Sequence, residues 1–300
     1  MNWHKINEVK SDKLFTLGMD TNTVVKNKGL NKFSLISFDI DGTLRDQTGK
    51  VSSYLIDILQ RCKSEGAMLT AATGRSRLSA VSYVENFPMF DLLISFQGAL
   101  ITNLQTDEHM WESYMTSNQV SLAVRNLLEW DVDILVYVDD FIYVTKVTDW
   151  AKEYSQRNKV ELRTVEDLSS LGSNVFRVLA VGDEDIVREI ENDMNSRYSD
   201  TMYATRSLPN FCEILNNKSG KDKALEWLCD YYGIDQLEVL SFGNGFNDVD
   251  MLHWSGWGVA VEDGEFEAIA ASDDVTCAVS ADGVGKYLEK LLSQNKIGIN

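Results

Sequence analysis

The chain has 300 residues, of which 44% are hydrophobic and 25% charged, and its formal net charge is −18. This length predicts two globular domains rather than one core. The negative charge argues against nucleic acid and anionic membranes as partners, and no stretch approaches the ~20 apolar residues of a membrane span. The four cysteines lie far apart and no secretion signal is recognisable, so we expect a reduced, cytoplasmic protein.

The first predicted core strand is the apolar run 33–38, which follows an N-terminal extension, residues 1–32. The strand ends in the pentapeptide DIDGT, residues 39–43, which brings two carboxylates to its carboxyl end. Ligands of α/β sheets bind at that end. One carboxylate, Asp39, can attack a substrate, and the other, Asp41, can handle the proton of the leaving group. Alone, such a pair more often marks a solvated turn.

Strands and helices then alternate. We expect a helix ending at Gly66, a strand over 68–72, a helix near 78–86 and a strand over 92–96. Short strands separated by helices of ten to fifteen residues are typical of right-handed βαβ units. This segment therefore predicts a parallel sheet.

The pattern changes after about Asn103. Hairpins are expected over 134–146 and 202–215, with an apolar strand over 175–181 between them. Successive hairpins with helices predict an antiparallel sheet covered on one face. We therefore expect an α+β cap domain inserted into a parallel-sheet core, with the cap at 107–206 and the core at 33–106 and 207–300.

The parallel pattern resumes after the cap. A helix is expected over 221–232, and a strand over 239–242 leads into the polar segment 243–248. Closing helices are expected over 266–271 and 284–292. The chain thus returns to the core that it left before the cap.

The sequence resembles the haloacid dehalogenase superfamily of phosphotransferases, whose four motifs appear here in the expected order. The matching positions are Asp39, Asp41 and Thr43 for motif one, Thr73 for motif two, Lys221 for motif three and 244–248 for motif four. The finer resemblance is to the Cof-type subfamily (IIB), through ATGR at 72–75 and ADGV at 281–284. It spans about 33–292 and implies a Rossmann-like core with a C2B-type α+β cap.

The resemblance also implies a role for each motif residue. Asp39 would be the nucleophile that forms an aspartyl phosphate, and Asp41 the general acid and base. The phosphoryl group would be held by Thr43, Thr73, Gly74, Lys221 and Asn247. A magnesium ion would be held by Asp39, Asp41, Asn244 and Asp248. A solvated helix lysine and a surface ion pair remain the alternatives for Lys221 and Arg75.

Two residues depart from the Cof-type pattern. Asn244 stands where the family has an aspartate ligand, so it offers an oxygen but no charge. The lost charge is expected to cost roughly ten-fold or more in magnesium affinity, unless Asp248 compensates. Gln97 replaces an asparagine and keeps the amide on a longer stem.

These residues predict a magnesium-dependent phosphatase of a small phosphorylated metabolite, with a sugar phosphate as the expected substrate. Two alternatives remain: a phosphosugar mutase with the same type of cap, and a phosphometabolite-binding protein whose metal site Asn244 has weakened. We expect a monomer or a weak homo-oligomer. The candidate substrate contacts in the cap are Asp139, Asp140, Arg177, Arg206 and Asn210.

Overall fold

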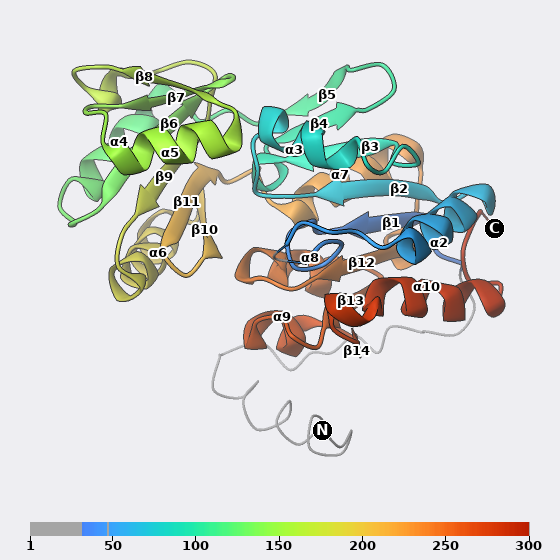
Figure 1. Ribbon diagram of the computed structural model, residues 1–300. Helices are drawn as coiled ribbons and strands as arrows, with labels where there is room; N and C mark the ends of the chain where they lie inside the picture. Colours follow the sequence, from blue (N-terminus) through green and yellow to red (C-terminus); the bar gives the residue numbers. More distant parts are fainter. Residues whose placement is uncertain (1–31, 47, 300) are drawn as a thin grey trace.

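A computed structural model describes residues 32–46 and 48–299, so the expected N-terminal extension lies almost entirely outside the described part. The described residues form two sheets, each with hydrophobic clusters of its own. Figure 1 shows them as two lobes, with the cap in green and yellow beside the larger core. The predicted α/β class, a parallel-sheet core carrying an α+β cap, is confirmed.

The core sheet has eight strands in the order β14-β13-β12-β1-β2-β3-β4-β5. The pairings from β14 to β3 are parallel, and β4 and β5 are antiparallel additions at one edge. Because β1 lies between β2 and β12, motif one emerges at the centre of the sheet. The strands are β1 (Leu35–Phe38), β2 (Met68–Ala72), β3 (Leu92–Ser95), β4 (Leu100–Asn103), β5 (His109–Glu112), β12 (Val239–Gly243), β13 (Trp257–Val261) and β14 (Asp274–Thr276).

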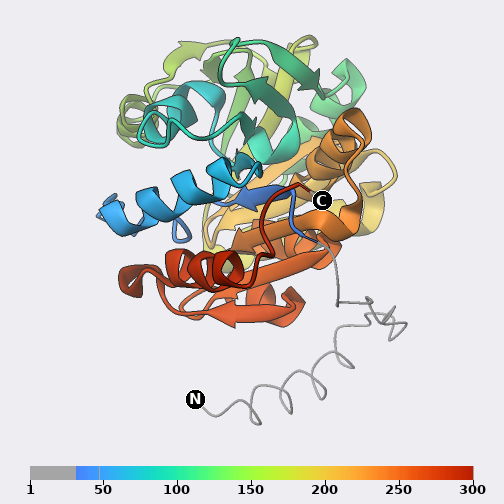
Figure 2. The same cartoon turned by 90° about the vertical axis from the view of Figure 1, so that its right-hand side faces the viewer.

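Helices cover both faces of this sheet, as Figure 2 shows with α2 in blue and α7 in orange on opposite sides. Leu55, Ile58, Leu59 and Cys62 recur at helical spacing and form the buried face of α2. Ser52 caps that helix by accepting a hydrogen bond from the amide of residue 55 at 3.0 Å. The core helices are α2 (Ser53–Ser64), α3 (Arg77–Val84), α7 (Lys221–Tyr232), α8 (Val249–Trp254), α9 (Phe266–Ala271) and α10 (Gly283–Ser293).

The cap sheet has six strands in the order β10-β11-β9-β6-β7-β8, all antiparallel except the β7–β8 pair. Its strands are β6 (Asp133–Val138), β7 (Phe141–Val144), β8 (Glu161–Thr164), β9 (Val175–Val181), β10 (Met202–Leu208) and β11 (Phe211–Asn216). Its helices are α4 (Ser117–Leu127), α5 (Asp149–Asn158) and α6 (Glu184–Tyr198). α4 and α6 cover one face, whereas α5 and Phe96 of the core pack on the other. Both faces are therefore covered, not the one face that we expected.

Strand pairing also shifts the expected limits of the cap. β5 pairs with β4 in the core sheet, although it begins after residue 107. The hairpin of β10 and β11 pairs inside the cap sheet as far as Asn216, ten residues beyond the expected limit. Both differences have a local cause: the short strand β4 is not recognisable in the sequence, and the expected limit at residue 206 cuts through a hairpin. The short strands β8 and β14, of four and three residues, were not expected either.

Candidate active site

The four motifs meet at the carboxyl ends of neighbouring core strands. Asp39 follows β1, Thr73 follows β2, and the motif-four segment follows β12. Lys221 is the first residue of α7, which begins beside these ends. The side chains are almost fully buried: Asp39 is 5% exposed, and Thr73 and Lys221 are each 2% exposed. The fold thus gathers these sequence-predicted residues at one edge of the sheet.

Lys221 links two of the motif carboxylates. Its Nζ donates to Asp39 Oδ1 at 2.8 Å and to Asp248 Oδ1 at 2.7 Å. Burial, with the nearby charge of Asp248, raises the pKa of Asp39 to about 7. Burial alone would lower the pKa of Lys221, but the charges of Asp248 and Asp39 outweigh it and raise that pKa. The ammonium therefore stays charged, and the cluster has one negative charge in excess when both carboxyls are ionised.

Asp248 is fully buried and both of its oxygens have partners. While Oδ1 accepts from Lys221, Oδ2 accepts from the main-chain N–H groups of Asn244 and Gly245, each at 2.9 Å. The carboxylate thereby fixes the motif-four turn and aims the lysine. Asp248 was expected as a magnesium ligand; because both of its oxygens are engaged in this way, we propose a positioning role for it instead.

The Asn244 side chain faces three oxygens of motif one. With the amide nitrogen toward them, it donates to Thr43 Oγ1 at 3.0 Å, Asp39 Oδ2 at 3.1 Å and the main-chain oxygen of Asp41 at 3.0 Å. With the amide oxygen there instead, that oxygen lies about 3 Å from Asp39 Oδ2 and from the main-chain oxygen of Asp41. This is the spacing of neighbouring ligands around an octahedral Mg²⁺ with metal–ligand distances of ~2.1 Å. Gly42 permits this approach, because a Cβ there would lie 2.4 Å from the Asn244 amide.

The donor set therefore suits a hard cation. No three His, Cys, Asp or Glu side chains surround a common point within residues 32–46 and 48–299. A cation here would instead meet the Asp39 carboxylate, the Asp41 carbonyl and the Asn244 amide oxygen. All three are oxygen donors of the kind that Mg²⁺ prefers, and one of them is anionic.

The Asp41 carboxylate is held by arginine. Arg75 donates through Nε to Asp41 Oδ2 at 2.6 Å and through Nη2 to Oδ1 at 3.0 Å, a bidentate pair. Arg45 lies 3.6 Å from the same carboxylate. The guanidinium carbons of Arg45 and Arg75 lie 4.2 and 4.3 Å from the centre of the Tyr83 ring. The ion pair considered for Arg75 is thus a bidentate contact with the Asp41 carboxylate of motif one. Arg45 and Tyr83 were not predicted, because they carry no recognisable signal in the sequence.

The expected phosphate-binding residues have defined surroundings. Thr73 Oγ1 accepts from the main-chain N–H of Arg75 at 3.2 Å, and Asn247 Nδ2 donates to Gln97 Oε1 at 3.0 Å. Gly74 has no room for a side chain, because a Cβ would lie 2.2 Å from Gln97 Nε2. Of the expected set, Thr43 contacts Asn244 directly.

Two of the expected cap residues contact the core. Arg177 Nη1 donates to the Gly74 carbonyl at 2.5 Å and also pairs with Glu213. The Arg206 guanidinium lies 4.1 Å from the centre of the Phe246 ring in the motif-four segment. Glu213 was missed. A single charged residue within an apolar strand is a signal for it, since such a residue needs a buried partner.

The other expected cap residues lie at hairpin turns. Asp139 Oδ2 accepts from Asn174 Nδ2 at 3.3 Å, within the cap. Asp140 is exposed beside it, and Asn210 lies in the turn between β10 and β11. No described contact joins these three residues to the catalytic loops.

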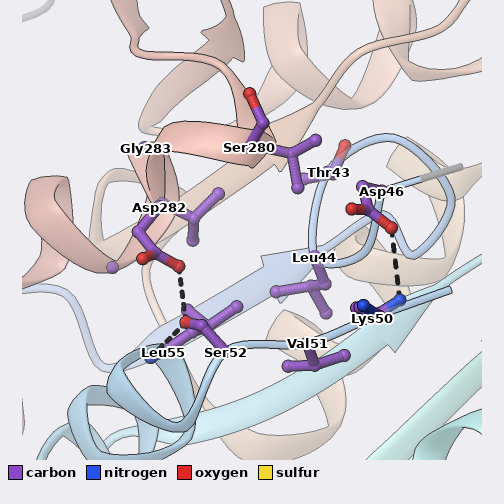
Figure 3. Close-up of a pocket in the computed structure, with 13 residues that line it drawn as sticks. Thr43, Leu44, Asp46, Lys50, Val51, Ser52, Leu55, Ser280, Asp282 and Gly283 are labelled. Carbon is purple, nitrogen blue, oxygen red and sulfur yellow. Dashed lines mark hydrogen bonds between the residues drawn. The ribbon is translucent and has the colours of Figure 1, made fainter. Parts of the chain in front are cut away.

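A cavity of 260 Å³ lies beside motif one, between the start of α2 and the start of α10. Figure 3 shows Thr43 and Leu44 in its wall, and Ser52 donating to Asp282 at 2.5 Å. Asp39, Thr73 and Lys221 are not among its lining residues. The cavity is therefore separate from the catalytic cluster.

No helix in the described part of the chain has both the length and the apolarity needed to cross a membrane.

The chain is similar to several known proteins over most of its length. The curated 5-amino-6-(5-phospho-D-ribitylamino)uracil phosphatase YitU of Bacillus subtilis is 28% identical over 267 residues, which cover 86% of this chain and 97% of that protein. A crystal structure of a haloacid dehalogenase-like hydrolase from Bacteroides thetaiotaomicron is 27% identical, with a TM-score of 0.73, and covers 87% of this chain and 100% of its own.

A subclass IIB sugar phosphatase structure is 24% identical, with a TM-score of 0.74, and covers 86% of this chain and 98% of its own, which shows a shared fold. The family model described as haloacid dehalogenase-like hydrolase matches residues 36–288. That match begins at the central strand, includes all four motifs and ends in α10. The chain therefore belongs to the haloacid dehalogenase-like hydrolases.

Proposed function

We propose that this protein is a magnesium-dependent phosphatase that hydrolyses a small phosphorylated metabolite through an aspartyl-phosphate intermediate. The observation that carries the proposal is the contact of Lys221 with both Asp39 and Asp248, directly beside the oxygens of motif one. This arrangement gives one carboxylate, Asp39, that can attack phosphorus. It also gives one fixed ammonium group, that of Lys221, which can bind the phosphoryl oxygens. Membership in the family supports the same reaction class.

The chain's own residues account for the proton and phosphoryl transfers. The Asp39 carboxylate would attack phosphorus, while Lys221 holds its Oδ1 in place. Asp41, oriented by the Arg75 fork, would give a proton to the departing alcohol and later take one from the attacking water. Thr73, Gly74 and Lys221 would hold the phosphoryl oxygens. The products are the alcohol and inorganic phosphate.

Magnesium, held by Asp39, the Asp41 carbonyl and Asn244, would offset the repulsion between the carboxylate and the phosphate dianion. With Asn244 in place of an acid, the donor set carries one negative charge only. The protein is therefore expected to bind the free ion weakly.

The proposed substrate is a phosphate monoester of a sugar or a polyol. One of the relatives named above is a sugar phosphatase. Another is a phosphatase named for a substrate with a phosphoribitylamino group. In this chain the cap places Arg177 and Arg206 against the catalytic loops. Arg206 is the one of the two proposed to donate hydrogen bonds to the oxygen atoms of such a leaving group, because Arg177 is engaged by Glu213 and the Gly74 carbonyl.

A phosphate-release assay over a panel of sugar, polyol and aryl phosphates, with and without magnesium, tests the proposal. We expect release that requires magnesium and that is fastest for one class of ester. Isomerisation of a phosphosugar without release would identify a mutase. Binding without either reaction would identify a binding protein. Either of the last two outcomes would contradict the proposal.

A further inference from the structure

One three-residue turn of the core touches both catalytic loops and the cap. Phe96, Gln97 and Gly98 follow β3 with φ values of 48°, 53° and 92°, all in the left-handed region. For Phe96 and Gln97 this conformation is unfavourable, so the surroundings must hold it. Part of that support comes from motif two: the N–H of Phe96 donates to the Arg75 carbonyl at 2.8 Å, and the N–H of Gln97 to the Thr73 carbonyl at 3.1 Å.

Both ends of the turn are fixed by other elements. The Phe96 ring stacks on Phe176 of the cap with ring centres 4.5 Å apart. At the other end, a Cβ on Gly98 would lie 2.1 Å from the carbonyl oxygen of Gly220, the residue before Lys221. The turn is therefore wedged between the cap and the start of the motif-three helix.

The Gln97 side chain uses its amide to join the cap to motif four. Its Nε2 donates to Glu213 of the cap at 3.0 Å, and its Oε1 accepts from Asn247 Nδ2 at 3.0 Å. Gln97 is 1% exposed and Glu213 is 2% exposed, so water does not replace these bonds. With one hydrogen of the Asn247 amide committed to Gln97, the plane and direction of that amide are set.

The same cap carboxylate also reaches motif two. Glu213 pairs with Arg177, whose Nη1 donates to the Gly74 carbonyl at 2.5 Å. The N–H of the same peptide unit belongs to Arg75 and donates to Thr73 Oγ1 at 3.2 Å. The orientation of this peptide unit therefore depends on where the cap places its buried ion pair.

We propose that Gln97 is a positioning residue through which the cap sets the orientation of the Asn247 amide and, by way of Glu213 and Arg177, of the Gly74–Arg75 peptide unit in motif two, and thereby the geometry of the phosphate site. The inference rests on the proposed phosphatase function. The length of the side chain matters, because an asparagine is shorter by one carbon–carbon bond of about 1.5 Å and cannot reach Glu213 and Asn247 together at hydrogen-bonding distance. The cap is then part of the phosphate site as well as its cover.

The test compares Gln97→Asn and Gln97→Met with the parent and with Gln60→Met, a matched change at an exposed position on α2. Three quantities are measured: the affinity for inorganic phosphate by calorimetry in magnesium, kcat and KM for an aryl phosphate, and the thermal unfolding temperature. We expect phosphate affinity and kcat to fall by roughly ten-fold in Gln97→Asn and further in Gln97→Met. Gln60→Met should match the parent.

A merely structural role for Gln97 would lower the unfolding temperature but leave phosphate affinity and kcat of the folded protein unchanged, and that result would overturn the inference. If Gln97→Met does not fold, Gln97→Asn decides, because asparagine tolerates the left-handed backbone. A double-mutant cycle of Gln97→Asn with Glu213→Gln should show that their effects on phosphate affinity do not add, and additive effects would also overturn it.

The assay of the parent separates this inference from the proposed function. If the parent hydrolyses phosphate esters but the Gln97 variants bind phosphate as the parent does, the function stands and the inference fails. If the parent hydrolyses none of the esters, the function fails, and the phosphate affinities of the variants still decide whether Gln97 positions the site.

Discussion

The core and the cap each bury a cluster of charged side chains, and the two clusters are balanced differently. In the core, one ammonium, Lys221, contacts two carboxylates, Asp39 and Asp248. In the cap, one guanidinium, Arg177, pairs with one carboxylate, Glu213. Both clusters are almost inaccessible to water. Only the core cluster carries an excess charge.

The core cluster, with its excess negative charge, can still bind a proton or a cation. The cap pair is already neutral and needs neither. A buried charge without a partner costs several kcal/mol, so the core cluster favours either a proton on Asp39 or an added cation. Burial, followed by the charge of Asp248, raises the pKa of Asp39 and so favours the proton in the same way. In the cap pair the two charges cancel. The contribution of the pair is to position its neighbours, Gly74 and Gln97.

The largest effect is expected from removing the excess charge. Asp39→Asn takes away the nucleophile, so turnover should fall by about 10³-fold or more in a phosphate-release assay. Asp57→Asn, an exposed change on α2, is the matched control. Turnover of the Asp39 variant within ten-fold of the parent would contradict the nucleophile assignment.

The same variant tests the charge balance through stability. A carboxyl whose pKa rises from 3.8 unfolded to about 7 folded binds its proton more tightly in the folded state. Its contribution to stability is therefore present at low pH and is lost as the pH rises from about 4 to about 7. Without magnesium, Asp39→Asn should remove this loss. Urea unfolding of the parent and the variant at pH 5 and pH 8 measures it, and equal pH dependence would argue against an unbalanced core cluster.

Removing one partner of the balanced cap pair should destabilise the protein, because it creates an unpaired charge instead of removing one. Arg177→Met leaves Glu213 buried without a counter-ion, so the free energy of unfolding should fall by about 3–5 kcal/mol. The exposed pair of Arg163 and Glu161 provides the control, because Arg163→Met breaks a solvent-screened ion pair and should lower the free energy of unfolding far less. Similar losses in urea unfolding would show that burial does not distinguish the two pairs.

A smaller effect is expected at the carboxylate that serves as acid. Arg75→Lys removes the bidentate grip on Asp41, so kcat should fall by roughly ten-fold. The loss should be larger for an alkyl phosphate than for a nitrophenyl phosphate, whose leaving group needs little protonation. Arg163→Lys serves as the control. Equal losses for both esters would mean that Arg75 does not act through the proton donor.

A change of similar size, in magnesium affinity rather than in kcat, is expected at the proposed cation site. Asn244→Asp adds an anionic ligand, so the half-saturating magnesium concentration should fall by about ten-fold. Calorimetry without substrate gives the same comparison independently of turnover, and Asn86→Asp is an exposed control. An unchanged magnesium affinity would exclude Asn244 as a ligand.

The sequence predicted the core better than the cap for a physical reason. Strands such as β1 and β12 are apolar runs buried on both faces, and each ends in a polar motif, so pattern and chemistry agree. β4, β8 and β14 have only three or four residues, too few for a periodicity to show. The limits of the cap were misplaced because hairpin pairing, rather than composition, decides which sheet a strand joins.

The motif side chains of the candidate site could be named from the resemblance to the haloacid dehalogenase motifs, but their partners could not. Asp41 and Arg75 are 34 positions apart, and Gln97 and Glu213 are 116 apart. Such contacts depend on how the cap rests on the core, which no local pattern encodes. Charged residues inside apolar strands, as at Arg177 and Glu213, are the one available hint, because each must find a partner when buried.

The position of β1 in the core sheet has a consequence for the order of folding. Leu35 pairs with Val239, whereas the cap strands pair among themselves between residues 133 and 216. During synthesis the cap can complete its sheet before β12 leaves the ribosome, while β1, which pairs early with β2, must wait for its second partner across some 200 residues. We expect pulse-labelled hydrogen exchange to protect β9 before β1. The catalytic centre would then be the last part of the protein to form, so a truncated chain can carry a folded cap and have no activity.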